Sequence, residues 1–342
     1  MKKLRFPDFK TAYINISNLY AKDINEYKKA LSLFIKYGLT FINLADNRVQ
    51  PMKVRLILLS SNTETTSIQI HFLRLFINKT VELIDKIDGL KVLLLNLLEA
   101  FHRIGRRKQV NRQVPPCNKK YLIIVHLFYE DLYSDFLQLI KKIDNRQFDL
   151  CITVPEDKSD LRQRVIHDGL ADKVLSIKNL GRDIRPFIMA LEEFDLNNYS
   201  CILKIHTKKS PHMPHGNEWR NELWSQLAGS QFAVDRVLEM FEKEPQLGMV
   251  GPRKFREKAR MECNLFKYLK LCRKLRLRSC KLDYFSGSMF WIRPEALQKL
   301  IGLESRGIKF SSTDRIDGNL EHAIERIFGA LCYSANLTVS DF

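Results

Sequence analysis

Long apolar runs are missing from this sequence of 342 residues. It contains no stretch of about 20 uncharged apolar residues, the length a helix needs to cross a bilayer, so we expect no membrane span. No apolar run follows Met1–Pro7, and we expect no signal peptide. The seven cysteines include no Cys-x-x-Cys pair. An odd number without metal-ligand spacing favours reduced thiols and a cytoplasmic protein over a secreted disulfide scaffold.

Acidic residues are scarce relative to basic ones. The chain has 56 Lys and Arg against 39 Asp and Glu, a net charge of +17. The excess is concentrated in Arg253–Lys281, which holds twelve Lys and Arg and two Glu. Such an excess indicates an anionic partner: nucleic acid, an anionic bilayer or a nucleotide-linked substrate. Apolar residues from Met261 to Leu275 at three- and four-residue steps predict a helix here. It either docks on a membrane surface or packs on the domain with a solvated basic face.

The N-terminal third differs from the rest. Apolar residues at helical spacing, as in Leu90–Phe101, predict a mainly helical region. The segment from Gln109 to Lys120 contains Pro115-Pro116 and has the composition of a linker. We therefore expect two parts, 1–118 and 119–342. The first could be an acceptor domain, a membrane dock or a dimer interface, and the sequence does not indicate an oligomeric state.

Strands and helices alternate from Tyr121 onward. Continuous apolar runs predict buried strands, and amphipathic or charged segments between them predict helices. This alternation predicts an α/β fold with a mostly parallel sheet, right-handed crossovers and flanking helices. The expected strands are Tyr121–His126, Phe148–Val154, Lys173–Ile177, Cys201–Ile205, Leu247–Gly251 and Phe285–Ile292.

One strand stops abruptly at His206-Thr-Lys-Lys-Ser210, and Pro211 prevents further pairing. Ligands of open α/β sheets lie outside the carboxyl ends of the strands. This strand therefore delivers an imidazole, hydroxyls and the ammonium groups of Lys208 and Lys209 to a ligand position. The cluster suits an anion, a diphosphate most of all. A solvated Lys-Lys turn is the alternative.

The segment Lys178–Phe187 joins a strand end to a helix start. Asn179 and Gly181 suit a tight turn with positive φ. Asp183 lies where a helix cap or a ligand contact would form, and Arg182 stands beside backbone N–H groups that attract anions. The alternative to a ligand site is an Asp cap with an Arg partner.

Three later segments carry further candidates. Trp219 either stacks on a sugar or base or packs within its helix. The small Ser286-Gly287-Ser288 turn would let a ligand approach the backbone. Asp317 lies at the start of the last helix, and Glu321 and Glu325 share a face of it. A carboxylate there serves either as a general base or as a helix cap.

Six segments in one order resemble the rhamnan synthesis protein F family of bacterial polysaccharide glycosyltransferases, over roughly 121–335. The first 118 residues carry no such resemblance. The segments are Asn179–Phe187, Leu203–Pro211, Trp219-Arg220, Gly248–Pro252, Ser286–Leu297 and Asp317–Arg326.

The resemblance implies transfer of a sugar, typically L-rhamnose from dTDP-L-rhamnose, to a growing surface glycan such as an O-antigen. The acceptor is usually carried on a polyprenyl lipid at the cytoplasmic face of the membrane. The protein would then be cytoplasmic, in peripheral contact with the anionic inner membrane surface. The implied layout is that of a GT-A glycosyltransferase, a nucleotide-binding α/β domain.

The resemblance also suggests roles for particular residues. Asn179, Gly181, Arg182, Asp183, His206, Lys208 and Lys209 would bind the donor, and Ser286, Gly287, Ser288, Trp219 and Arg220 would border the acceptor. The strand ends in His206-Thr-Lys208 where many GT-A enzymes carry Asp-x-Asp. Lysine and arginine would then neutralise the departing diphosphate, so we expect no metal and no other cofactor. Asp317, followed by Glu321 and Asp183, is the expected base of an inverting single displacement.

Two other functions remain open at this point. The charge and neighbouring aromatic residues fit a nucleic-acid-binding protein, although no recognised motif supports one and we expect no nucleic-acid partner. A catalytically silent scaffold, docked at the membrane with other synthases, would also fit the missing Asp-x-Asp motif.

Overall fold

The computed structural model describes residues 120–144, 147–209, 216–310 and 317–342, and most residues of a helical stretch between 91 and 99. The chain divides into a unit of residues 1–82, none of them described, and a unit of residues 83–342. Apart from the stretch at 91–99, the predicted helical region 1–118 therefore lies outside the described residues.

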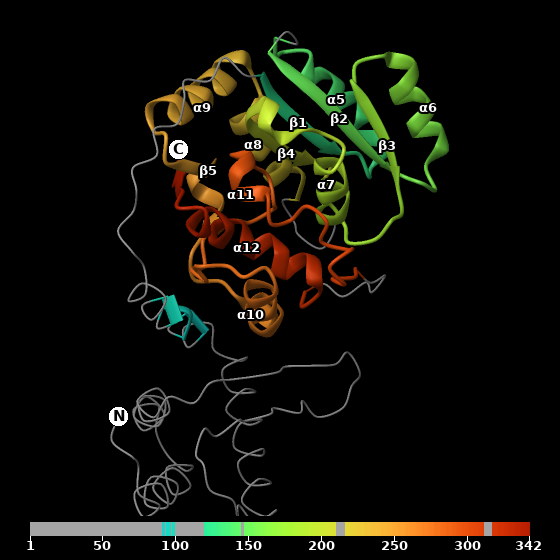
Figure 1. The fold of residues 1–342 in the computed structure, drawn as a ribbon. Coiled ribbons are helices and arrows are strands. Elements are labelled where there is room, and N and C mark those ends of the chain that lie inside the picture. The colour runs from blue at the N-terminus through green and yellow to red at the C-terminus, as the bar shows by residue number, and fades with distance from the viewer. Residues whose placement is uncertain are drawn as a thin grey trace, which may run out of the picture. The chain divides into compact units, whose positions relative to one another are not determined.

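One seven-stranded sheet forms the centre of the second unit, in the order β3-β2-β1-β4-β8-β5-β9 (Figure 1). β1 pairs in parallel with β2 and β4, and β2 with β3. β8 is antiparallel to both β4 and β5, whereas β5 and β9 are parallel. The predicted mostly parallel α/β sheet is confirmed. The strands are β1 Lys120–His126, β2 Phe148–Pro155, β3 Lys173–Ile177, β4 Tyr199–His206, β5 Leu247–Gly251, β8 Phe290–Ile292 and β9 Thr338–Asp341.

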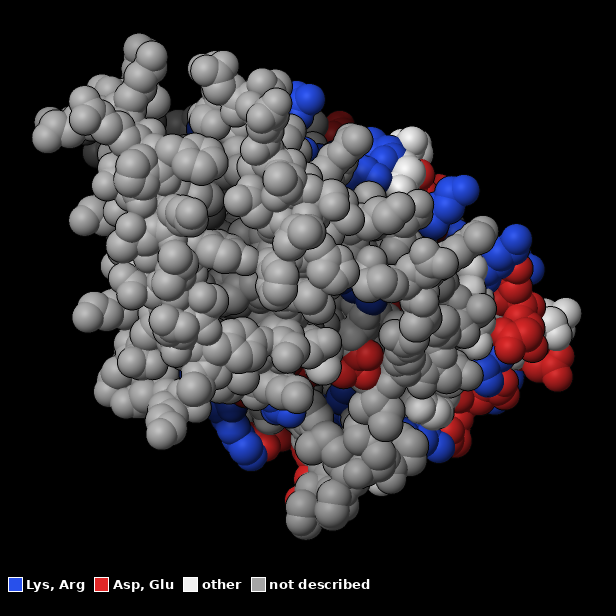
Figure 2. All heavy atoms as spheres, turned by 90° about the horizontal axis from the view of Figure 1, so that it is seen from below, with Lys and Arg blue, Asp and Glu red and all other residues white. Residues whose placement is uncertain are grey.

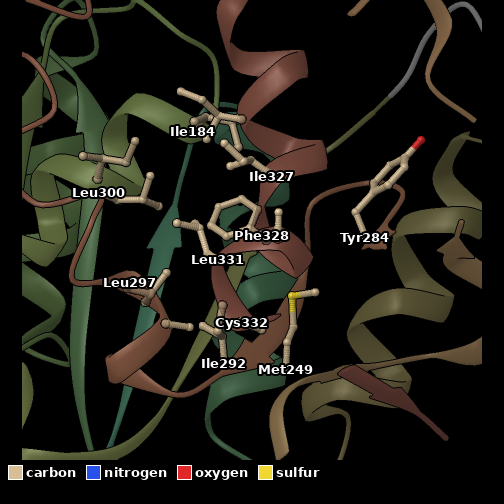
Figure 3. Close-up of a cluster of buried hydrophobic side chains, with 14 of the residues drawn as sticks. Ile184, Met249, Tyr284, Ile292, Leu297, Leu300, Ile327, Phe328, Leu331 and Cys332 are labelled. Atoms are coloured by element: carbon tan, nitrogen blue, oxygen red, sulfur yellow. The ribbon is translucent and has the colours of Figure 1, made fainter. Parts of the chain in front are cut away.

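Helices cover both faces of the sheet because successive strand residues point to opposite sides. Ile123 and Ile205 pack in one apolar cluster with α5, α6, α8 and α9. Ile124 and Ile202 pack in the other with α7, α10, α11 and α12. Figure 3 shows part of this second cluster, where Ile184 of α7 lies near Ile327 of α12. The helices are α5 Tyr133–Ile140, α6 Ser159–Asp168, α7 Ile184–Leu191, α8 Gly216–Ala228, α9 Gln231–Lys243, α10 Leu265–Lys274, α11 Pro294–Leu297 and α12 Leu320–Ser334.

The basic segment is not one helix, contrary to the sequence prediction. Its first part makes a 3-10 turn, Arg253–Phe255, and a two-residue strand, β6 Arg256–Glu257. A second 3-10 turn, Glu262–Asn264, precedes α10. The reason is tertiary pairing. β6 pairs with β7, Tyr284–Phe285, and the Arg256 guanidinium bonds Asp283 and Asp341 at 2.8–2.9 Å.

Charges of both signs meet on the surface of this segment. Arg253 pairs with Asp341 at 2.9 Å and Lys254 with Glu222 at 2.5 Å. In the view of Figure 2, the coloured part of the surface likewise shows Lys and Arg next to Asp and Glu. No helix in the described part of the chain has the length and apolar content needed to cross a membrane.

A helical stretch from the N-terminal side packs on the same unit. Leu95 is buried in the apolar cluster of α10 and α12. The Glu99 carboxylate accepts hydrogen bonds from Ser279 Oγ at 2.8 Å and from the Cys280 N–H at 3.0 Å. The Lys91 ammonium donates to the carbonyl of Glu262. Residues 91–99 are thus attached to the α/β unit at several points.

Candidate functional site

A turn with left-handed backbone follows β3 and places the Asp183 side chain next to β4. Gly181 has φ 68° and Arg182 has φ 52°, so the predicted positive φ is confirmed at Gly181, whereas the second such residue is Arg182 and not Asn179. A Cβ at Gly181 would lie 2.5 Å from a ring carbon of Phe310, and only glycine fits. Asn179 is exposed beside this turn. Asp183 occupies the cap position of α7, but its side chain makes no capping hydrogen bond.

Lys204 joins this turn to the far side of the site. Its ammonium is 1% exposed and lies 2.6 Å from Asp183 Oδ2. It also donates to the backbone oxygen of Ser288 at 2.7 Å and contacts Ser288 Oγ at 3.0 Å. These three contacts match the three N–H groups of an ammonium. The segment expected at the donor and the one expected at the acceptor are therefore bridged by one buried side chain.

Backbone carbonyls and the Glu325 carboxylate hold the small turn before β8 in place. Gly287 has φ 90°, and Ser288, a residue with a Cβ, has φ 55°. The Ser288 N–H donates to the Phe285 carbonyl at 3.0 Å, and the Ser286 N–H to the Phe255 carbonyl at 2.7 Å. Glu325 accepts a hydrogen bond from the Gly287 N–H at 3.1 Å. A left-handed serine is strained, and such strain persists only where neighbours enforce it. The predicted strand Phe285–Ile292 is therefore shorter than expected: β8 begins at Phe290, after the predicted Ser286–Ser288 turn.

Two histidines lie side by side at the carboxyl ends of β1 and β4. His126 and His206 are partners in the register of these strands. His126 Nδ1 lies 3.0 Å from Thr153 Oγ1. His206 is 5% exposed, and its Nδ1 lies 3.6 Å from Asp183 and has no hydrogen-bond partner in the described part of the chain. Burial lowers the pKa of His126 to about 4 and that of His206 to about 3. Both imidazoles are therefore neutral at pH 7.

Lys208 and Lys209 point to different places. The Lys208 ammonium lies 4.7 Å from the centre of the Trp219 ring, and its charge acts on Asp183 and Glu325. Lys209 pairs with Asp131 at 2.5 Å, away from these carboxylates. Among the described residues, no carboxylate forms an ion pair with Lys208. Lys208 is therefore the better placed of the two to meet an anionic ligand.

The two residues of the predicted acceptor side on α8 differ in their surroundings. A Cβ on Gly287 would lie 3.3 Å from the Trp219 ring, so this ring borders the turn before β8. Trp219 Nε1 is buried and has no partner among the described residues. Arg220 is 4% exposed and donates to the carbonyl of Lys208 at 3.2 Å and to Asn217 at 3.0 Å. Arg220 thus holds the backbone that follows β4 in place.

Three carboxylates, one just before α12 and two in its first half, have different partners. Asp317 accepts hydrogen bonds from the Cys263 N–H at 3.1 Å and Asn264 Nδ2 at 2.8 Å, so both of its oxygens are engaged. Glu321 is 2% exposed, with one oxygen 3.8 Å from Arg182 and the other without a hydrogen-bond partner among the described residues. Glu325, one turn further, faces the turn before β8.

The carboxylates also differ in their pKa values. Burial opposes ionisation of Asp183, but the neighbouring His206, Lys204 and Lys208 together outweigh it and hold the pKa of this carboxyl far below its usual range. Burial likewise opposes ionisation of Asp317, yet the Asn264 and Cys263 donors lower its pKa. Burial raises the pKa of Glu325 above the ordinary value of 4.5, although Arg326 opposes this. Glu325 is thus the strongest proton acceptor of the three.

Lys204 is not among the site candidates named from the sequence, and Glu325 has no role assigned there. Lys204 stands in the middle of an apolar strand, and a charge there must find a partner because burial of an unpaired charge is costly. That signal could have been used. Glu325 was seen to share a face with Glu321, but nothing in the sequence tells which of the two faces Gly287. In the described part of the chain, no three His, Cys, Asp or Glu side chains gather as metal ligands would.

The sheet defines a Rossmann-like α/β domain, with a polar site at the edge formed by its strand ends. The ends of β1 and β4 bring two neutral histidines and Lys208 to one edge, where such domains bind ligands. The α7 cap position and α12 add the carboxylates. The family model described as rhamnan synthesis protein F matches residues 26–337. The chain therefore belongs to the rhamnan synthesis protein F family. The match begins well before residue 121, so most of the N-terminal region belongs to the family pattern as well.

A curated relative is similar over part of the chain. The uncharacterized protein WxcX of Xanthomonas campestris pv. campestris, strain B100, is 30% identical over 218 residues, which are 62% of this chain and 31% of WxcX. WxcX of strain ATCC 33913 gives the same values. The chain thus spans about a third of the length of the curated relatives that it matches.

Proposed function

We propose that this protein is a glycosyltransferase of bacterial polysaccharide synthesis with a GT-A-like domain. It transfers a sugar, L-rhamnose from dTDP-L-rhamnose, to a polyprenyl-linked glycan at the anionic inner face of the membrane. The observation that carries the proposal is the meeting of Arg182 and Lys208 with buried carboxylates of α12 at one sheet edge. Membership of the rhamnan synthesis protein F family supports it.

The proposed reaction is a single displacement with inversion. A carboxylate takes the proton of the acceptor hydroxyl, and the oxygen attacks the anomeric carbon of the donor sugar. The bond from this carbon to the diphosphate oxygen breaks, and dTDP leaves with the electron pair. Lys208 and Arg182 stabilise the charge on the leaving diphosphate. Asn179, Gly181 and His206 complete the donor side, and Ser286–Ser288 with Trp219 the acceptor side.

Glu325 is the carboxylate that we favour as the base, followed by Glu321. Asp317 has donors on both oxygens, and Asp183 is paired with Lys204, so both are held in their ionised form by their partners. Glu325 has a raised pKa and faces the turn expected at the acceptor. A base must bind its proton during the reaction, which favours the more basic carboxylate.

We propose transfer without a metal ion. The Lys204 ammonium fills the space between Asp183 and Ser288, where a divalent cation would otherwise have oxygen ligands. Asp183 is thereby neutralised from within the chain. Lys208 and Arg182 then meet the diphosphate directly, as positively charged donors meet phosphate elsewhere.

Calorimetry with dTDP-L-rhamnose in EDTA tests this proposal. We expect binding by the wild type and by Lys209→Ala, because Lys209 is paired with Asp131. Lys208→Ala should weaken binding at least tenfold, the effect of one charged hydrogen bond of about 1.5 kcal/mol or more. Binding that requires Mg²⁺ or Mn²⁺ would contradict the metal-free site. Binding without transfer to any glycan acceptor would favour a catalytically silent scaffold.

A further inference from the structure

The first turn of α12 contains a histidine whose proton position is fixed by a helix cap. Asn319 caps the helix, and its backbone N–H donates to His322 Nδ1 at 3.2 Å. A ring nitrogen that accepts a hydrogen bond carries no proton, so in the neutral ring the proton lies on Nε2. Burial and the charge of Arg182 lower the pKa of His322 to about 4. His322 is therefore neutral at pH 7 and has one N–H donor.

That donor has no protein acceptor in the described part of the chain. His322 Nε2 is buried and without a hydrogen-bond partner there. Its neighbour Glu321 likewise has a buried oxygen without one. A buried donor or acceptor left unpaired costs about 1–3 kcal/mol, and native proteins rarely retain one without a reason. Two such atoms in one helical turn, beside Arg182, indicate a position that a ligand completes.

We propose that His322 is a binding residue of this site, which donates a hydrogen bond from Nε2 to an oxygen of the nucleotide-sugar donor. The inference rests on the proposed function. The Arg182 and Asp183 charges both act on this ring, so it lies near the turn assigned to the donor. A neutral donor suits this position because it binds oxygen without adding a charge next to Glu321. The oxygen belongs either to the diphosphate or to a sugar hydroxyl.

Two substitutions separate the cap from the donor. In His322→Asn, the amide oxygen can take the place of Nδ1 and keep the cap, but nothing replaces Nε2–H. In His322→Gln, the longer side chain can bring an amide N–H close to the place of Nε2. We expect His322→Asn to melt near the wild-type temperature and to bind dTDP-L-rhamnose about tenfold more weakly, the loss of one hydrogen bond. His322→Gln should bind within a few-fold of the wild type.

Calorimetry with dTDP-L-rhamnose and with dTDP distinguishes the two sources of the oxygen. A loss for both ligands assigns it to the diphosphate, and a loss for dTDP-L-rhamnose alone assigns it to the sugar. Unchanged binding by a folded His322→Asn overturns the inference and leaves the proposed function intact. Losses that follow thermal stability in both variants also overturn it, since His322 is then only a cap. A wild type that binds neither ligand overturns the inference together with the proposed donor.

Discussion

Lys204 shows how one residue can determine the geometry of a site. Its ammonium is buried, the Asp183 carboxylate beside it is mostly buried, and each neutralises the other. Removing one partner of a buried pair leaves the other charge without compensation, which is strongly destabilising. We therefore expect Lys204→Met to lower the free energy of unfolding by about 3 kcal/mol or more. Urea denaturation measures this change.

The control for Lys204 is an exposed pair on the same domain. Lys173 and Glu193 lie 2.5 Å apart, with side chains about two-fifths exposed. Lys173→Met should cost less than about 1 kcal/mol. The double variant Asp183→Asn/Lys204→Met should recover part of the loss, because both charges of the pair are then removed. Equal effects of Lys204→Met and Lys173→Met would contradict the stabilising role of the buried pair.

Glu325 should determine the pH dependence of transfer at low pH. Burial raises its pKa above 4.5, and a base works only when it has lost its proton. Activity should therefore rise with pH through the pKa of Glu325 and level off above it. Initial rates between pH 4.5 and 8 measure this profile. Glu325→Gln should remove at least 99% of the turnover, by analogy with the 10²–10⁴-fold contribution of general bases.

Asp317 provides the comparison for this experiment. Its oxygens hold Cys263 and Asn264, so Asp317→Asn should affect stability more than the pH profile. Glu321→Gln tests the second carboxylate on the same face. An Asp317→Asn variant with little turnover and normal stability would return the role of base to Asp317.

At the scale of elements, the turn between β3 and α7 makes the sharpest prediction. Gly181 combines a positive φ with a ring carbon of Phe310 only 2.5 Å from any added Cβ. Gly169, at the end of α6, has a similar φ of 62° but open space around it. Gly169→Ala should cost about 1 kcal/mol, the price of left-handed backbone alone. Gly181→Ala should cost about 2–4 kcal/mol because the ring must also move.

Thermal or urea unfolding of these two alanine variants gives the comparison directly. Since both glycines have left-handed backbone, the difference between them isolates the contact with Phe310. Gly181→Ala should in addition weaken donor binding, because it displaces Arg182. Equal costs at the two positions would show that the Phe310 ring yields freely.

Elements that form from continuous apolar runs could be predicted from the sequence. β3 and β5 have the predicted bounds, Lys173–Ile177 and Leu247–Gly251. The basic segment could not, because its helical spacing extends beyond α10. Met261 and Leu275 fit the apolar stripe and are buried, yet both lie outside the helix. There, pairing of β6 with β7 and the Arg256 contacts outweigh helical propensity.

The sequence predicts which residues gather at the site but not how their side chains point. Strand ends meet at one edge of a parallel sheet, so the grouping of His206 and Asp183 follows from the fold. The directions of side chains do not. Adjacent residues Lys208 and Lys209 have equal chemistry, and their different neighbours, Trp219 and Asp131, separate their roles. Which face of α12 meets Gly287 likewise depends on how that helix packs.

For the whole molecule, three histidines with lowered pKa values in the described part of the chain predict sensitivity to acid. Burial lowers the pKa values of His126, His206 and His322 from 6.5 to about 4, 3 and 4. As the pH falls below 6.5, these residues take up protons in the unfolded chain first. The free energy of unfolding should therefore fall between pH 6.5 and about 4, by up to about 4 kcal/mol per pH unit for three protons.

Urea denaturation at pH 5 and pH 7 measures this loss. His322→Asn removes one of the three groups and should make the loss smaller by about a third. Stability that is equal at the two pH values would contradict the assignment of buried neutral histidines.

The attachment of residues 91–99 to the α/β unit has a consequence for how this domain is inherited. Glu99 supplies the acceptor for the Ser279 hydroxyl and the Cys280 N–H, and Leu95 fills a place in the core. A gene fragment that begins at the linker before β1 would leave both donors without the Glu99 acceptor and the core without the Leu95 side chain. A portable module, moved into a longer polypeptide by recombination, must therefore include the codons from Lys91 onward.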